Sequence, residues 1–148
     1  MAIIPLPPDF SEFLKLLQDH EVKYLLIGGY AVGYHGYVRA TGDMDIWFER
    51  DQKNAEKLVN VLQNFGFKTD ELSHDLFLKS DNIIRMGVPP VRIELMNSIS
   101  GVAFSECFAN RIVENWNGVN VNILSLDKLK VNKKASGRLK DLSDLEHL

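Results

Sequence analysis

Two aspartates separated by a single residue are the first feature of this sequence that could support chemistry. Asp43 and Asp45 lie in a stretch where polar and apolar residues alternate, and that period of two is typical of a β-strand. In a strand both carboxylates project from one face, roughly 6–7 Å apart along the chain. Neighbouring carboxylates repel each other unless cations neutralise them, and Mg²⁺ prefers such oxygen ligands. The pair therefore predicts a metal site; the alternative is a solvated acidic face on an exposed strand.

A third carboxylate stands alone in a strand that is otherwise largely apolar. Glu94 lies in the segment 91–96, which reads as a strand. If this strand lies beside that of Asp43 and Asp45, Glu94 completes an acidic triad. It would serve as a metal ligand, or as the base that accepts a proton from an attacking hydroxyl. Arg92, two residues earlier, would share the face of Glu94, so a simple ion pair between these two residues is the alternative.

Two glycines separate an apolar strand, expected over residues 22–27, from a short helix expected over residues 30–35. Glycine lets backbone N–H groups approach a ligand closely, because it has no side chain. The N-terminus of a helix presents unpaired N–H groups and the positive end of the helix dipole, which favour phosphate oxygens. Gly28 and Gly29 are therefore candidates for phosphate binding. A tight turn without a ligand needs the same residues and is the alternative.

The elements that must position these residues follow a mixed order of helices and strands. Apolar residues at helical spacing predict helices over residues 8–20 and 52–65. The stretch 75–85 is compatible with one or two strands, or with a helix followed by a strand. This order predicts an α/β (α+β) fold in which a short mixed sheet has helices packed mainly on one side. The remaining expected elements are a helix over 103–111, a hairpin of strands 111–116 and 119–124 around Asn117-Gly118, and helices over 125–136 and 139–148.

The composition excludes several classes of protein. The chain has 148 residues, of which 45% are hydrophobic and 25% charged, and we expect one soluble domain spanning residues 1–148. Its net charge of -3 argues against a general nucleic-acid binder. Cys107 is the single cysteine, which excludes an internal disulfide and suits a reducing cytoplasm. The start lacks the basic residues of a signal peptide, and no apolar stretch reaches the roughly 18 residues of a membrane helix. We therefore expect a cytoplasmic protein.

Taken together, three segments resemble the signature of the DNA polymerase β-type nucleotidyltransferase superfamily. They are Leu26-Ile27-Gly28-Gly29, Asp43-Met44-Asp45-Ile46 and Ile93-Glu94-Leu95. The longer string from Gly28 to Asp45, with Arg39-Ala40-Thr41-Gly42 before the first aspartate, is similar to a bacterial subgroup of short stand-alone enzymes. Some of these are toxins or partners in toxin–antitoxin and phage-defence modules, and the ending Lys133 to Leu145 is also similar to theirs. The third carboxylate of that subgroup is usually aspartate, so Glu94 is a departure that lengthens the reach by one methylene.

The resemblance implies an enzyme that depends on Mg²⁺ or Mn²⁺. Such an enzyme transfers a nucleoside monophosphate from an NTP, such as ATP, to a hydroxyl-type acceptor and releases pyrophosphate. It implies that Asp43, Asp45 and Glu94 are catalytic and bind the metal, and that Gly28 and Gly29 hold phosphates. The acceptor stays open between tRNA, a protein and a small molecule, bound in an open cleft, by a dimer partner or by another protein. The alternative function is a non-catalytic, antitoxin-like binding partner with the same fold.

A basic cluster near the C-terminus supplies further candidates for nucleotide binding. Lys133 or Lys134, together with Arg138, could neutralise the charge of a triphosphate, and we favour Lys134 and Arg138. Arg39, in the loop before the acidic strand, is a candidate for phosphate contact. The cluster could instead be a solvated helix face, or could hold an RNA backbone.

Four other polar residues are expected to serve the fold. Asp141 and Asp144 are more typical of caps or ion-pair partners of the last helix than of metal ligands. His35 is expected to be a packing or hydrogen-bonding residue of the short helix. Thr41 is expected to support the loop before the acidic strand.

Overall fold

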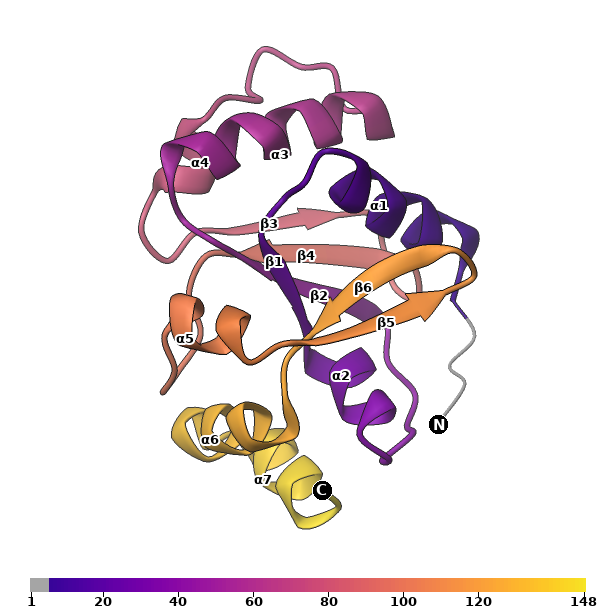
Figure 1. Cartoon of the computed structure of the whole chain (residues 1–148), viewed down its shortest axis with the longest axis vertical. Helices are drawn as coiled ribbons and strands as arrows, with labels where there is room; N and C mark the ends of the chain where they lie inside the picture. Colours follow the sequence, from indigo (N-terminus) through magenta and orange to yellow (C-terminus); the bar gives the residue numbers. More distant parts are fainter. Residues whose placement is uncertain (1–5) are drawn as a thin grey trace.

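The computed structural model describes residues 6–148, which form seven helices and six strands (Figure 1). The first residues of the chain, on which the expectation about a signal peptide partly rests, lie outside this range. The helices are α1 (Pro8–Asp19), α2 (Gly28–Tyr34), α3 (Gln52–Phe65), α4 (Asp75–Leu78), α5 (Phe104–Ala109), α6 (Leu126–Ser136) and α7 (Leu139–Glu146). The strands are β1 (Tyr24–Ile27), β2 (Asp43–Phe48), β3 (Ile83–Met86), β4 (Arg92–Met96), β5 (Ile112–Trp116) and β6 (Val119–Ile123).

The strands form one mixed sheet in the order β3-β4-β2-β1-β6-β5. Strand β2 pairs with β1 in the antiparallel direction and with β4 in the parallel direction. All four residues of β1 are buried, which explains why its sequence is an unbroken apolar run rather than an alternating one. The two strands that carry the predicted acidic residues are therefore direct neighbours near the middle of the sheet.

Helices cover the two faces of the sheet unequally. Helices α1, α3 and α4 lie together on one side (Figure 1), where Phe48 of β2 packs edge-on against Phe77 of α4 with ring centroids 5.6 Å apart. On the other side, α5 covers one end of the sheet through the contact of Phe104 with Trp47. Helices α6 and α7 pack against each other and face the sheet across a cavity. The predicted fold class, an α/β fold built on a mixed sheet, is confirmed.

A buried asparagine fixes α3 to the ends of two central strands. The Asp51 side chain caps α3 by accepting a hydrogen bond from the backbone N–H of Asn54 (2.7 Å). The Asn54 side chain, only 3% exposed, accepts from the backbone N–H of Lys23 (2.9 Å). It donates to the carbonyls of Lys23 (3.0 Å) and Glu49 (2.8 Å). These bonds hold β1 and β2 together at the end of the sheet opposite the acidic residues.

Some local elements differ from the expectations. Helix α2 begins at Gly28, so both glycines belong to its first turn. The undecided stretch 75–85 contains α4 and then β3, while the helix expected over 103–111 is the shorter α5. The hairpin is confirmed, because Asn117 and Gly118 both adopt positive φ angles, which the favoured two-residue turn requires. None of the described helices has the length and apolar character needed to cross a membrane.

Candidate active site

The pairing of β2 with β4 brings the three predicted carboxylates together. In the parallel register Asp45 lies opposite Glu94, and Asp43 lies two residues before Asp45 on the same face. One ligand oxygen from each of the three carboxylates lies within 4.8 Å of the others. Met44 and Ile46 alternate with the aspartates and are fully buried on the opposite face of β2, in keeping with the period of two. The apolar half of β2 thus anchors the strand and fixes the direction of its acidic half.

The Asp45 carboxylate has one oxygen that is shielded from solvent. Its Oδ1 atom is buried and has no hydrogen-bond partner among the described residues. Burial, and then the negative charges of Glu94 and Asp43, raise the pKa of Asp45 to about 6, against the opposing effect of Lys140 and Lys133. An oxygen in this position would be stabilised by a cation. The donor set of three clustered carboxylates matches the hard oxygen ligands that Mg²⁺ or Mn²⁺ takes.

Two arginines on β3 and β4 pair with two of the three carboxylates, Asp43 and Glu94. Arg92 donates from Nε and Nη2 to the two oxygens of Asp43, at 2.7 and 3.0 Å, and its Nη2 lies 3.2 Å from Glu94 Oε1. Arg85, opposite Glu94 in the antiparallel register, donates to Glu94 Oε1 at 3.0 Å. The ion pair foreseen between Arg92 and Glu94 is therefore present, and it coexists with the triad. Arg85 is a site residue that the sequence did not indicate.

Gly28 allows the backbone before α2 to approach the triad. Gly28 has φ +65°, and a Cβ atom placed on it would overlap the carboxylate of Asp45. A Cβ on Gly29 would come within 2.8 Å of the Thr41 side chain. Thr41 donates its hydroxyl proton to the backbone carbonyl of Asp43 at 3.1 Å, in keeping with the expected supporting role. The two glycines are thus required by close packing around the acidic strand, and Gly28 also lines the cavity.

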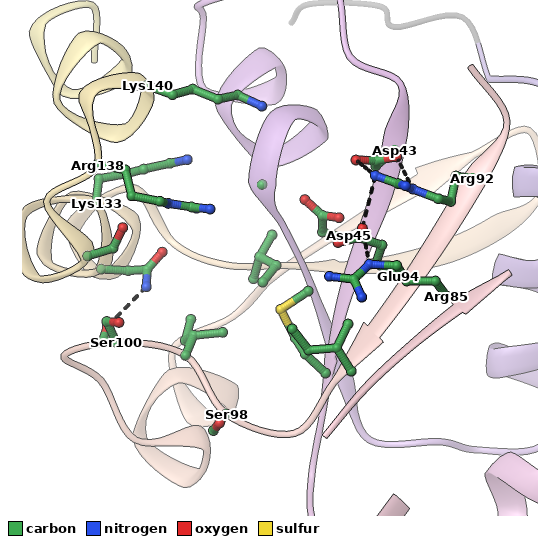
Figure 2. A pocket seen from close by; sticks show the side chains of 17 residues that line it. Asp43, Asp45, Arg85, Arg92, Glu94, Ser98, Ser100, Lys133, Arg138 and Lys140 are labelled. Atoms are coloured by element: carbon green, nitrogen blue, oxygen red, sulfur yellow. Dashed lines mark hydrogen bonds and ion pairs between the residues drawn. The ribbon is translucent and has the colours of Figure 1, made fainter. Parts of the chain in front are cut away.

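A cavity of about 550 Å³ lies between the triad and the C-terminal helices. The triad and the two arginines lie on one wall, and Lys133, Arg138 and Lys140 come from α6, α7 and their connection on the other (Figure 2). Hydroxyl and amide side chains complete the polar part of the lining. The lining residues are Ile27, Gly28, Asp43, Asp45, Ile83, Arg85, Arg92, Glu94, Met96, Ser98, Ile99, Ser100, Asn132, Lys133, Ser136, Arg138 and Lys140.

A buried ion network holds the C-terminal wall in place. The Nζ atom of Lys133 lies 3.1 Å from both Asp141 Oδ1 and Asp144 Oδ2, and each of these carboxylates is 1% exposed. Asp141 also accepts hydrogen bonds from Ser136 and Arg138. Burial raises the pKa of Asp141, but its bonds to Arg138, Ser136 and Lys133 outweigh that effect and lower the pKa to about 2. The expectation that the two aspartates are ion-pair partners agrees with this network.

Two of the predicted nucleotide-binding residues do not reach the cavity. Arg39 donates from Nε and Nη2 to both oxygens of Asp144, at 2.7 and 2.8 Å, and so ties the loop before β2 to α7. Lys134 is exposed and is absent from the cavity lining, whereas its neighbour Lys133 is 5% exposed and lies in it. Helical spacing could have distinguished the two lysines, because Lys133 lies four residues after the buried Leu129.

His35 has the expected structural place. Its Nε2 atom lies 2.8 Å from the backbone carbonyl of Leu124, at the end of β6. The histidine therefore links the region after α2 to the strand that precedes α6. It is not part of the cavity lining.

Comparisons with known proteins agree with this geometry. A sequence model described as aminoglycoside-2''-adenylyltransferase matches residues 9–145. No curated protein sequence matches the chain. Among solved structures, a protein from Thermotoga maritima assigned as a nucleotidyltransferase aligns with a TM-score of 0.62 and 14% identity, over 93% of this chain and 88% of the other. An antigenic nucleotidyltransferase-like protein from Paracoccidioides brasiliensis aligns with a TM-score of 0.53 and 17% identity, over 97% and 77%. At these identities, the structural matches speak for the fold alone.

Proposed function

The chain belongs to the aminoglycoside-2''-adenylyltransferase family, and we propose that it transfers a nucleoside monophosphate from an NTP to the hydroxyl of an acceptor, with release of pyrophosphate. The observation that carries this proposal is the triad of Asp43, Asp45 and Glu94, in which a buried oxygen of Asp45 has no partner among the described residues. The family and the fold support nucleotidyl transfer in general. The dependence on Mg²⁺ or Mn²⁺ and the roles of the individual residues are our proposal.

In the proposed reaction, the acceptor hydroxyl oxygen attacks the α-phosphorus of the NTP. A new oxygen–phosphorus bond forms, the bond from the α-phosphorus to the oxygen bridging to the β-phosphorus breaks, and pyrophosphate leaves. Asp43 and Asp45 would hold divalent cations, which supply charge neutralisation at the phosphates. Glu94 would act as a further ligand or accept the hydroxyl proton. Most of the rate enhancement would come from positioning and electrostatic stabilisation, as is usual for phosphoryl transfer.

The C-terminal wall of the cavity would bind the triphosphate. Lys133, Arg138 and Lys140 line the cavity opposite the carboxylates. Lys133 and Arg138 also pair with buried aspartates there, and the three side chains together would offer donors to the charge that develops on the leaving group. The proposal moves this role from Lys134 to Lys133, because Lys133 lies in the cavity. Arg39 would position the loop before β2 through its bond to Asp144 rather than touch phosphate.

Incorporation of labelled nucleotide tests the proposal. The purified chain is incubated with each of the four NTPs, with Mg²⁺ or Mn²⁺, and with protein, RNA and small-molecule acceptors. Thermal stabilisation by metal and NTP is measured in parallel, since binding to the folded state raises its stability. Asp43→Asn and Asp45→Asn should abolish incorporation, whereas Asp70→Asn, which removes an exposed carboxylate after α3, should not. Absence of both turnover and stabilisation with every NTP would exclude the proposal.

The second candidate function is a non-catalytic binding partner, antitoxin-like, with the same fold. It is favoured by the two hydrogen bonds from Arg92 to the oxygens of Asp43, which balance the charge of that carboxylate without a metal. The two functions differ in their response to the cation. A binding partner would show neither nucleotide incorporation nor a metal-dependent shift in thermal stability.

A further inference from the structure

The charge of the cavity restricts the chemistry of the acceptor. Among the described residues that line it, five side chains are cationic and three are anionic, while the aspartates that pair with Lys133 and Arg138, Asp141 and Asp144, lie behind the lining. All three anionic groups are the clustered carboxylates of Asp43, Asp45 and Glu94. The lining thus offers no further carboxylate to an acceptor that carries ammonium groups.

The positive side chains of the two walls would face different substrates, the NTP on one wall and the acceptor on the other. If the triphosphate lies against Lys133, Arg138 and Lys140, as proposed above, the opposite wall is left for the acceptor. That wall carries Arg85 and Arg92, whose guanidinium groups lie beside the triad (Figure 2). The Arg85 side chain is 55% exposed and the Arg92 side chain 30% exposed, so both are accessible from the cavity.

The present partners of these arginines are the carboxylates proposed to hold the metal. Arg92 bonds to Asp43 and lies 3.2 Å from Glu94, and Arg85 bonds to Glu94. A carboxylate that shares its charge with a divalent cation attracts a neighbouring guanidinium less. The positive charge of Arg85 and Arg92 then becomes available to a third group on this wall. A guanidinium pairs with phosphate through two parallel hydrogen bonds, which makes arginine a specific reader of that group.

We propose, on the basis of the proposed function, that the acceptor carries a phosphate group beside its hydroxyl and that Arg85 and Arg92 recognise that phosphate. A polycationic aminoglycoside is a poor acceptor for this chain, because it would meet the two arginines without a free carboxylate to balance its ammonium groups. The phosphate could belong to a small phosphate ester or to the end of a polynucleotide, since both present the same chemistry. The proposed acceptor therefore differs from the aminoglycosides after which the family is named.

Binding of probes that differ in charge tests the proposal. The full chain is saturated with Mg²⁺ and a non-hydrolysable analogue of the preferred NTP, and Kd values are measured calorimetrically. The probes are glucose, glucose 6-phosphate, a short oligoribonucleotide with a free 3′-hydroxyl, and the aminoglycoside kanamycin. At least one phosphate-bearing probe should bind about tenfold more tightly than glucose, a difference typical of a charge-assisted pair. Kanamycin should bind no more tightly than glucose. The two phosphate probes distinguish a small ester from a polynucleotide end.

Variants separate recognition by Arg85 from general electrostatic attraction. Arg85→Gln should weaken binding of the phosphate probe about tenfold, and Arg85→Lys should restore only part of the affinity, because lysine keeps the charge but loses the paired hydrogen bonds. Lys53→Gln removes an exposed charge from α3, on the opposite face of the sheet, and should leave the affinity unchanged.

Three results would overturn the inference. They are tighter binding of kanamycin than of glucose, phosphate probes that bind no better than glucose, and an Arg85→Gln variant with unchanged affinity for the phosphate probe. Any of these with normal binding of the NTP analogue would leave the proposed function intact. Failure of the analogue itself to bind would instead count against the proposed function, and the acceptor inference would fall with it.

Discussion

Arg92 donates two hydrogen bonds to the Asp43 carboxylate, from Nε to Oδ1 at 2.7 Å and from Nη2 to Oδ2 at 3.0 Å. The two residues are also register partners on the parallel strands β4 and β2. A metal ion at the triad must compete with this pair for the oxygens of Asp43. The strength with which the site binds a cation therefore depends on the arginine as well as on the carboxylates.

Replacement of Arg92 should raise the affinity for metal. In Arg92→Gln the Asp43 carboxylate loses its bidentate partner, and its free charge attracts a cation more strongly. Because the pair is partly exposed, we expect Mn²⁺ to bind about fivefold more tightly, equivalent to ~1 kcal/mol. Calorimetric titration with Mn²⁺ measures the change, and Lys53→Gln serves as the control for loss of one positive charge. Equal or weaker Mn²⁺ binding in Arg92→Gln would contradict this prediction.

Asp45 should make the metal-free protein less stable as the pH rises. Its pKa is raised to about 6 by burial, then by Glu94 and Asp43, so between about pH 4 and pH 6 the unfolded chain loses this proton before the folded one does. Stability falls with rising pH in that window, since the folded state binds more protons. Asp45→Asn removes the effect and should gain about 2 kcal/mol at neutral pH. Urea denaturation with a chelator, at about pH 4 and pH 7, gives the comparison. A wild-type and variant that respond identically to pH would refute it.

Alanine at Gly28 should disturb the triad, while alanine at Gly137 should not. Both glycines have nearly the same φ, +65° and +67°, but a Cβ at Gly28 meets the Asp45 carboxylate and one at Gly137 meets only the Lys134 carbonyl at 3.8 Å. Each substitution costs about 1 kcal/mol of backbone strain. Gly28→Ala should cost about 2 kcal/mol more, through displacement of Asp45, and should also weaken Mn²⁺ binding. Chemical denaturation and metal titration of both variants check this, and equal losses would count against it.

The adjacent lysines Lys133 and Lys134 should behave very differently. Lys133→Ala leaves the buried carboxylates of Asp141 and Asp144 without their shared cation, which should cost about 3 kcal/mol. Lys134→Ala removes an exposed side chain and should change the unfolding free energy by less than about 0.5 kcal/mol. Urea denaturation measures both. No loss of stability in Lys133→Ala would show that the network does not hold α6 to α7, and a large loss in Lys134→Ala would contradict the predicted difference between the two lysines.

Acid should weaken the same network in the wild-type chain. Although burial raises the pKa of Asp141, its bonds to Arg138, Ser136 and Lys133 lower it to about 2. The contribution of this carboxylate to stability is complete above about pH 4 and is lost as the pH falls through the folded-state pKa. Denaturation midpoints below about pH 4 should therefore drop in the wild type and much less in Asp141→Asn. A parallel decline in both chains would argue for another acid-sensitive group.

The residue pattern predicts local structure well where one face of an element is buried. Met44 and Ile46 alternate with two aspartates, and the strand can satisfy both sets of residues in only one orientation. The same alternation around Glu94 gives β4. The order of strands is a different matter, because the neighbour relationship of β2 and β4 depends on how the whole chain packs. The triad could be proposed from the sequence through the resemblance, but its register could not.

Ion pairs and strand pairings between distant segments explain why some residues lie elsewhere than predicted. Arg39 is bound to Asp144, 105 residues later, and nothing near Arg39 indicates that carboxylate. Arg85 reaches the site only because β3 folds back beside β4. Helical spacing alone would have favoured Lys133 over Lys134, because the buried face of α6 continues from Leu129 to Lys133. Ion pairs between distant segments thus mark the limit of prediction, whereas helix faces do not.

The parallel pairing of β2 with β4 also bears on how the protein folds. The antiparallel pair of β1 and β2 joins segments close in the chain and can form early, carrying Asp43 and Asp45 but not Glu94. Glu94 arrives only when β4 docks, after the chain has passed through α3, α4 and β3. Titration with Mn²⁺ during refolding would therefore report when β4 docks on β2, because tight binding needs carboxylates from both strands. Metal binding by the acidic cluster therefore indicates that β2 and β4 have reached their native pairing.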